Sequence, residues 1–201
     1  MADADPGGRT NQKRRTRKAL LEAAARLMQS GRKPTLDEVA EEALVSRATA
    51  YRYFPGVEPL LIEAALDIAM PSPALFQGDP CVDAAERALK AEAAVDAMVR
   101  GNETALRMML INALQRSLDG EGGEGLPARQ NRRAALIEAA LAPSPELDSR
   151  DKERLARALA LVIGTEARLV FKDVLQLGDD EARDVKAWMI RSLVGAARRR
   201  D

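Results

Sequence analysis

Residues 35–54 contain the side chains whose types and spacing best suit recognition of another molecule. Their sequence, TLDEVAEEALVSRATAYRYF, predicts two short helices joined by a tight corner. On the second helix Ala50 and Phe54 are four residues apart and can face a core, which leaves small and polar side chains outside. Such an outer face can enter the major groove of DNA, because bulky side chains would hold the helix away from the base edges.

We predict that the outer side chains contact double-stranded DNA in different ways. Arg47 lies in the first turn and can donate two hydrogen bonds to guanine, and Thr49 can contact a thymine methyl group or a phosphate. Tyrosine hydroxyls can donate to phosphates. The predicted contacts on these two helices are Thr35, Ser46, Arg47, Ala48, Thr49, Tyr51, Arg52 and Tyr53. The alternative is an ordinary corner of a helical bundle, with Arg47 as a solvated surface side chain.

A basic run precedes the two helices. Arg9 to Lys18 holds six basic residues and no acidic one. Residues 1–54 hold eleven basic and seven acidic side chains, a difference of +4, so the remainder of this neutral chain carries −4. We expect Arg14, Arg17 and Lys18 to contact phosphates or the adjacent minor groove, which would add salt-dependent affinity. A solvated helix face is the alternative.

The segments that must position these side chains are helical. Apolar residues recur at three- and four-residue spacing, and strand-like runs are absent, which predicts an all-α fold of about nine helices. We expect a disordered leader over 1–12, a three-helix DNA-binding domain over 13–56 and a helical domain over 57–201. Residues 57–70 would form the connecting helix, and residues 119–125 a flexible acidic loop.

Local signals define the ends of the predicted helices. Thr35 and Glu38 have the spacing of a capping box, and Ser46 has the side chain of an N-cap for the next helix. Two long helices at about 150–177 and 180–199, separated by one tight turn, predict a C-terminal helical hairpin.

The segment TLDEVAEEALVSRATAYRYFPGVEPLL resembles the DNA-binding signature of the TetR (tetracycline repressor-like) family of bacterial regulators. The resemblance covers residues 13–66 and rests on the tyrosine-x-tyrosine-phenylalanine ending, the proline after it and a leucine-bearing fourth helix. The remainder resembles the family in layout. The resemblance implies a cytoplasmic bacterial repressor that forms a homodimer through its last two helices on a pseudo-palindromic operator. It also implies a C-terminal cavity for a small apolar or amphipathic effector.

Two positions depart from the family's pattern. The corner residue is commonly glycine, and here it is Leu44, for which a left-handed backbone costs about 1 kcal/mol or more. The fourth helix commonly begins with a lysine that contacts phosphate, and here the position is Val57. We therefore expect a slightly different corner and the loss of that phosphate contact.

Candidate effector and dimer residues lie in the C-terminal half. Methionine adapts to apolar ligands, and an amide or guanidinium group can orient a polar part of one. The candidates for an effector pocket are Met98, Arg107, Met108, Met109, Asn112 and Trp188. The candidates for the dimer interface are Leu159, Ile163, Gly164, Glu166, Val170, Trp188 and Leu193. For the pocket candidates, plain core or surface positions are the alternative.

Two of the dimer candidates stand out within the predicted helix 150–177. Gly164 costs about 1 kcal/mol relative to alanine inside a helix, which indicates a close helix approach. Glu166 interrupts an apolar stripe, and we expect it to pair across the interface, for example with Arg168, rather than to point into a cavity.

Several classes of protein are disfavoured by composition. With one cysteine and no histidine the chain offers neither an intrachain disulfide nor a typical transition-metal site. We find no nucleophile elbow, phosphate-binding glycine loop or zinc motif, so we expect no enzyme and no cofactor. We also expect no membrane span. The alternatives to an effector-controlled repressor are a regulator without a small-molecule effector and a helical ligand-binding or scaffold protein that has lost DNA binding.

Overall fold

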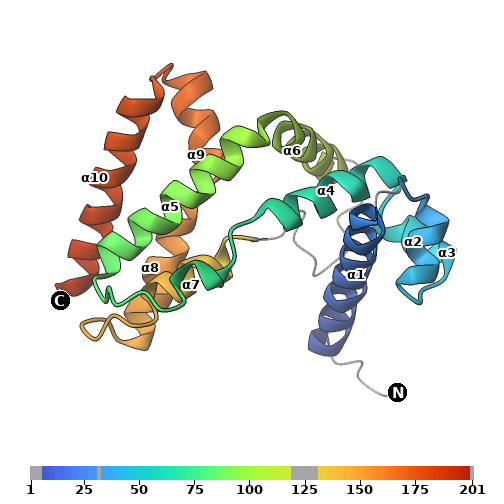
Figure 1. The fold of residues 1–201 in the computed structure, drawn as a ribbon, viewed down its shortest axis with the longest axis horizontal. Coiled ribbons are helices and arrows are strands. Elements are labelled where there is room, and N and C mark those ends of the chain that lie inside the picture. The colour runs from blue at the N-terminus through green and yellow to red at the C-terminus, as the bar shows by residue number, and fades with distance from the viewer. Residues whose placement is uncertain (1–5, 31–32, 119–130, 200–201) are drawn as a thin grey trace. The chain divides into compact units, whose positions relative to one another are not determined.

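The computed structural model describes residues 6–30, 33–118 and 131–199. The described residues form helices, turns and loops and no strand, so the predicted all-α fold is confirmed (Figure 1). They divide into two compact units, which are described separately here. The N-terminal unit takes its residues from 1–69 and 104–130, and the C-terminal unit from 70–103 and 131–201. The predicted acidic loop at 119–125 lies outside the described residues.

The N-terminal unit is built around one apolar core shared by four helices. Its elements are α1 (Pro6–Gln29), α2 (Leu36–Glu42), α3 (Arg47–Tyr53), α4 (Val57–Ala69) and, from Thr104 onward, α6 (Glu103–Leu118). Helix α1 packs on α2 and α4, and α2 packs on α3. Leu20, Val39, Phe54 and Leu60 are buried together in this core. The first helix begins at Pro6, so residues 6–12 are helical and the predicted disordered leader over 1–12 is wrong for them; proline suits a first helical turn.

Side chains and backbone close the corner between α2 and α3. Thr35 and Glu38 form the predicted capping box, and the Ser46 hydroxyl accepts a hydrogen bond from the Thr49 N–H at 3.1 Å. Leu44 adopts the left-handed conformation, with φ of 55°. The N–H groups of Leu44 and Val45 donate to carbonyls of α2 at 3.0 Å each, the pattern of a Schellman motif. Leucine therefore takes the conformation that glycine usually takes.

A buried ion pair joins α1 to α4. One terminal nitrogen of Arg17 donates to both carboxylate oxygens of Glu63, at 2.6 and 2.7 Å. Both side chains are only 9% exposed. The guanidinium also lies over the ring of Phe54, 4.8 Å from its centroid. The cation thus ties three segments of the unit together from inside.

Helix α4 packs into this core, although the segment that contains it is apolar enough to resemble a membrane span. Val57–Phe76 has the length and composition that a membrane span requires. The segment nevertheless contains the buried, paired Glu63 and the half-buried Asp67, and its α-helix ends at Ala69 after 13 residues. A span needs about 20 helical residues. We therefore attribute its apolar character to core packing against α1.

The C-terminal unit is a layered helical bundle. Its elements are η1 (Pro73–Phe76), α5 (Ala84–Gly101), α7 (Ala134–Leu141), α8 (Ser149–Val162), α9 (Thr165–Leu169), the π-helical turn η2 (Val170–Val174) and α10 (Asp179–Arg198). Helix α5 packs on α7 and α10, and α8 also packs on α7 and α10. Helix α8 lies beside α10 (Figure 1), but α9 and η2 separate them along the chain, so they do not form the predicted hairpin of two long helices joined by one tight turn.

The prediction of one continuous helix over 150–177 is wrong. It breaks at Ile163 and Gly164, where Gly164 has a φ of 139° that L side chains rarely adopt. A Cβ at this position would collide with the guanidinium of Arg133. Arg133 in turn pairs with Glu166 at 3.0 Å. Glycine is therefore needed at this position for the backbone conformation at the helix break and for the close contact with Arg133. It does not mark the predicted close approach of two helices.

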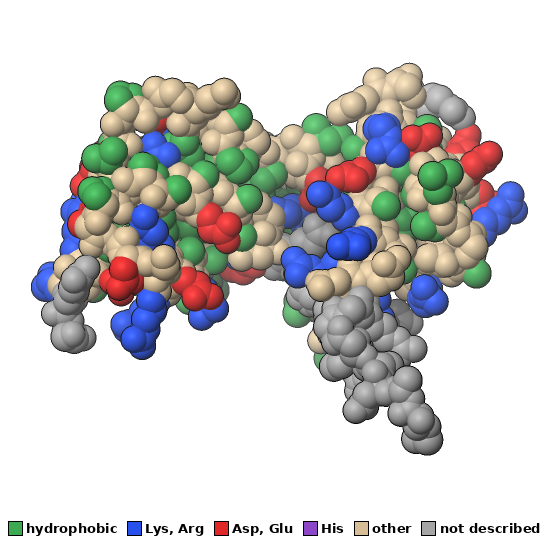
Figure 2. All heavy atoms as spheres, turned by 90° about the horizontal axis from the view of Figure 1, so that it is seen from below, with side chains coloured by type: hydrophobic (Ala, Val, Ile, Leu, Met, Phe, Trp, Pro, Cys, Tyr) green, Lys and Arg blue, Asp and Glu red, His purple; other side chains and the backbone are tan. Residues whose placement is uncertain are grey.

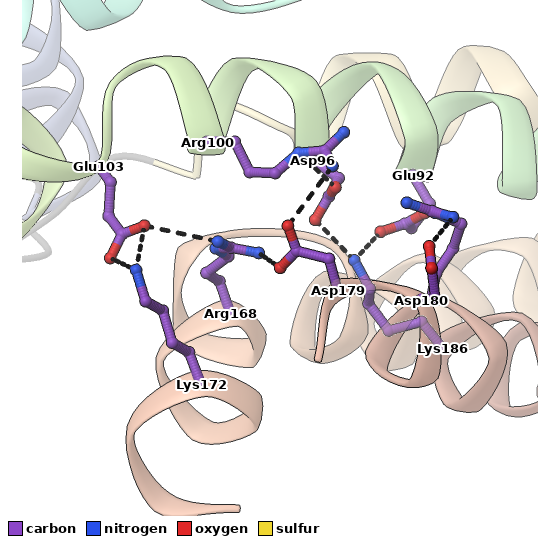
Figure 3. Close-up of polar contacts among 10 residues, drawn as sticks. Glu92, Asp96, Arg100, Glu103, Arg168, Lys172, Asp179, Asp180 and Lys186 are labelled. Carbon is purple, nitrogen blue, oxygen red and sulfur yellow. Dashed lines mark hydrogen bonds and ion pairs between the residues drawn. The ribbon is translucent and has the colours of Figure 1, made fainter. Parts of the chain in front are cut away.

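Ion pairs fix α10 to α5 and α9 within this unit (Figure 3). Lys186 of α10 is buried and bonds Glu92 and Asp96 of α5, the latter at 2.7 Å. At the start of α10, Asp179 accepts from Arg168 of α9 at 2.7 Å. Arg168 also lies 3.6 Å from Glu103, where α6 begins. The inner face of α10 is thus held by charge pairs at two levels.

We predict that the Arg17–Glu63 pair is essential to the N-terminal unit. Arg17→Met removes the cation from the buried Glu63 carboxylate and should cost about 3–5 kcal/mol of unfolding free energy. Arg17→Met combined with Glu63→Leu should recover most of that loss, because both charges are then gone. Urea unfolding followed by circular dichroism measures both effects. A loss below 1 kcal/mol for Arg17→Met would contradict the prediction.

We predict a loss of stability in acid from the C-terminal unit. The hydrogen bond from Arg168 lowers the pKa of Asp179 below its ordinary 3.8, and the hydrogen bond from Lys90 does the same for Asp79. Because these pKa values are lower in the folded chain, their stabilisation is present above the unfolded value and disappears as pH falls through the folded value. The urea midpoint should therefore drop below about pH 4. Asp179→Asn should reduce this dependence, whereas Asp180→Asn, at a neighbouring side chain that is 92% exposed, should leave it unchanged.

Candidate nucleic-acid interface

Helix α3 presents a polar outer face on an apolar inner one. Ala50 and Phe54 are buried, at 0% and 1% exposure, so their predicted inward orientation is confirmed. Arg47, in the first turn, has a side chain that is 76% exposed. The other exposed residues of the helix are Ala48, Tyr51 and Arg52, and Thr49 and Tyr53 are half-buried. The face therefore has the small and polar character that a groove-binding helix needs.

Contacts within α3 order part of this face. The guanidinium of Arg52 lies 5.6 Å from the ring centroid of Tyr53. The hydroxyls of Ser46 and Thr49 are 2.8 Å apart, so one donates to the other. Thr35 is used in a similar way, because its hydroxyl bonds the Glu38 carboxylate at 3.0 Å. These capping hydroxyls are thus shared with the fold, while Arg47 and Tyr51 project from it.

The basic run before the motif divides into two kinds of side chain. Arg14 is exposed, and Lys18 is 75% exposed with Glu22 at 3.5 Å. Arg17 instead lies inside the unit on Glu63, which removes it from the predicted DNA contacts. A signal for this was present in the sequence, because Arg17 precedes Leu20 by three residues and therefore lies on the apolar face of α1.

A contact that the sequence did not reveal links the two helices of the motif. The Arg47 guanidinium lies 3.2 Å from the carboxylate of Asp37, in the first turn of α2. The other Asp37 oxygen is buried and has no hydrogen-bond partner. Ten residues and a corner separate the two side chains, so no helical spacing could have indicated the pair.

The two departures from the family pattern occupy different environments. Leu44 is 93% exposed at the corner, with the left-handed backbone described above. The expectation of a different corner is thus not met, because leucine bears that conformation itself. Val57 is partly buried against the core of the unit. An apolar side chain in this position cannot donate to a phosphate.

The predicted effector residues belong to different units. Arg107, Met108, Met109 and Asn112 lie on α6 in the N-terminal unit, where Met109 is buried and Met108 is 44% exposed. Met98 is buried on α5 of the C-terminal unit. Trp188, also in the C-terminal unit, is 69% exposed on α10, so it lies on the surface and does not line an enclosed cavity.

The predicted dimer residues also separate by environment. Leu159 and Ile163 are buried at 0% and 1% within the chain itself, so they are core residues and not available to a second copy. Glu166 pairs with Arg133 of the same chain at 3.0 Å. The remaining candidates are at least partly accessible: Gly164, Val170, Trp188 and Leu193.

Two hollows lie on the α8 and α10 surface of the C-terminal unit. One, of about 680 Å³, lies between the helices and is lined by Leu155, Leu193 and three arginines, among other residues. The other, of about 450 Å³, lies along α10 and is lined by Trp188, Ser192 and Gly195, among other residues. On the face of this unit visible in Figure 2, apolar side chains are interspersed with charges of both signs.

One comparison with known proteins gives a match. Residues 20–64 match the family model for bacterial regulatory proteins of the tetR family. This segment contains the corner, α2, α3 and the start of α4, together with the second half of α1. Neither the curated proteins nor the solved structures gave a match to the chain. The helix-turn-helix geometry and the matched segment agree, so this part of the chain is a DNA-binding segment of the kind that tetR-family bacterial transcription regulators carry.

Proposed function

We propose that the protein is a homodimeric repressor that binds a pseudo-palindromic operator and is released from it by a small-molecule effector. The observation that carries the DNA-binding part is the outer face of α3, where Arg47 and Tyr51 project from a capped, core-anchored helix. Exposed Arg14 and Lys18 on α1 would contact phosphates, and the capped start of α2 at Thr35 would offer backbone donors to another. As a bacterial DNA-binding regulator it would act in the cytoplasm.

A second copy of the chain would bind the outer face of α8 and α10. Leu161 of α8 and Trp188 of α10 are large apolar side chains that are 76% and 69% exposed, so both are available to a second copy. The exposed charges near the start of α10 are mainly acidic, at Asp180, Glu181 and Asp184 beside Arg183, and those at its end are basic, at Arg198 and the C-cap Arg199. A two-fold axis perpendicular to α10 would place opposite ends of the two α10 helices together and bring these charges into complementary positions.

The effector and repressor parts of the proposal are supported by the family resemblance. Within the C-terminal unit, buried Met98 is the predicted pocket residue best suited to an apolar ligand. An effector releases DNA only if it binds one spacing of the two recognition helices more tightly than the other. The direct test is a gel-shift titration with DNA flanking the protein's own gene. No selective shift, even at low salt, would show that the protein has lost DNA binding.

Two substitutions should separate base reading from phosphate binding. Arg47→Ala should cost about 1–3 kcal/mol at the operator and relax selectivity at one base pair per half-site, because it removes a base-edge donor. Arg14→Ala should weaken all duplexes alike and reduce the salt slope by about one. Fluorescence anisotropy with single-base operator variants over a range of salt measures both. If Arg47→Ala weakens all sequences equally, Arg47 contacts a phosphate instead.

The dimer depends in our proposal on Trp188. Trp188→Ala should weaken self-association about ten-fold or more, because buried tryptophans dominate interface free energies. Sedimentation equilibrium measures the dissociation constant directly. Val82→Ala is the matched control, since it also trims an apolar side chain that is about half exposed, at 53%, but lies before α5. Equal dissociation constants for wild type and Trp188→Ala would exclude this face as the interface.

A further inference from the structure

The Asp37–Arg47 pair is unlike the other ion pairs of the DNA-binding helices. It joins the first turn of α2 to the first turn of α3, and its arginine is the side chain best placed to reach a base edge. The Arg47 side chain is 76% exposed, and that of Asp37 is 38% exposed. One Asp37 oxygen forms the ion pair with Arg47 at 3.2 Å, and the other is buried without a hydrogen-bond partner.

Folding stability accounts for little of this arrangement, since the favourable interaction of Asp37 with the N-terminal end of α2 is worth only about 0.3–1 kcal/mol. Exposed ion pairs contribute little to folding, because water and salt screen them. A buried carboxylate oxygen without a donor is unfavourable, because it has lost its hydration. Thr35 and Glu38 already cap α2, so Asp37 is not needed for that purpose. One carboxylate oxygen of Asp37 therefore lies without a donor beside the side chain that faces DNA.

We propose that Asp37 is a positioning residue that sets sequence selectivity through Arg47, an inference that rests on the proposed function. A long, solvated arginine at the start of a helix can turn toward a base or toward a phosphate. The pair involves one terminal nitrogen of Arg47 and leaves the other N–H groups for a guanine edge, whose recognition needs two parallel donors.

The negative charge of Asp37 also increases sequence selectivity. A carboxylate at the DNA-facing end of two helices repels phosphates, so a duplex that offers no matching base edge is bound less well. The correct operator offsets this repulsion by the two hydrogen bonds that the oriented guanidinium makes. Asp37 thus lowers the affinity for non-specific DNA more than the affinity for the operator. This fits a neutral chain whose basic excess lies only in its N-terminal segment.

The test uses the full-length protein with Asp37→Asn, which keeps the shape and removes the charge. The probes are duplexes that the wild-type protein selects from a randomised pool and scrambled duplexes of equal composition. Asp37→Asn should bind scrambled DNA about three- to ten-fold more tightly, as expected for losing one nearby repulsive charge. The ratio of operator to scrambled affinity should fall about ten-fold, in the range for one disordered base contact. Asp37→Glu should restore part of the ratio.

Two controls distinguish positioning from simple charge. Glu41→Gln removes an exposed carboxylate from the same helix and should leave the affinity ratio unchanged. In an Arg47→Ala background, Asp37→Asn should no longer alter the ratio, because the side chain that it positions is absent. The urea midpoint of Asp37→Asn should equal that of the wild type, which excludes a folding defect as the cause.

The results that would contradict the positioning role differ from the result that would contradict DNA binding. If Asp37→Asn strengthens operator and scrambled DNA equally, or leaves both unchanged, the positioning role is overturned while the DNA-binding function stands. The same holds if its effect on the ratio persists without Arg47. If the wild-type protein selects no sequence from the pool, the proposed function fails, and the inference fails with it.

Discussion

The recognition surface depends on a cation that never reaches it. Arg17 lies between α1 and α4 on Glu63 and over the ring of Phe54. Helices α2 and α3 have seven residues each, far too few to be stable alone in water. Their orientation must come from the helices on which they pack, and the buried pair fixes two of those segments together with the end of α3. Burying two charges is costly, and two short hydrogen bonds to both carboxylate oxygens offset that cost.

Much of the motif was predictable because its determinants are local. The Thr35 capping box, the Ser46 cap and the inward pair Ala50 and Phe54 all depend on spacings of three or four residues, which helical geometry converts directly into contacts. Helical periodicity places Arg17 on the apolar face of α1, which predicts burial, whereas the charge of the surrounding run predicts a DNA contact. The structure buries Arg17, so its position on the helix was a better guide than its residue type.

The other differences between the sequence predictions and the structure arise from contacts between residues far apart in the sequence. The Asp37–Arg47 pair crosses a corner, and the break at Gly164 is matched by Arg133, which lies about thirty residues earlier. A glycine in an apolar stripe is compatible with either a helix interior or a break. Only the arginine that occupies the space of its missing side chain distinguishes the two. For the same reason Leu159 and Ile163 suited an interface by sequence, although packing within the chain buries them.

In the C-terminal unit, ion pairs hold the inner face of α10 and leave its outer face exposed. Lys186 on the inner face of α10 is held by two carboxylates of α5, and Asp179 holds the start of the helix to Arg168 (Figure 3). Trp188 lies on the outer face of the same helix and remains exposed. Because α10 is fixed from behind, a second copy would meet a preformed surface and lose little conformational entropy on binding.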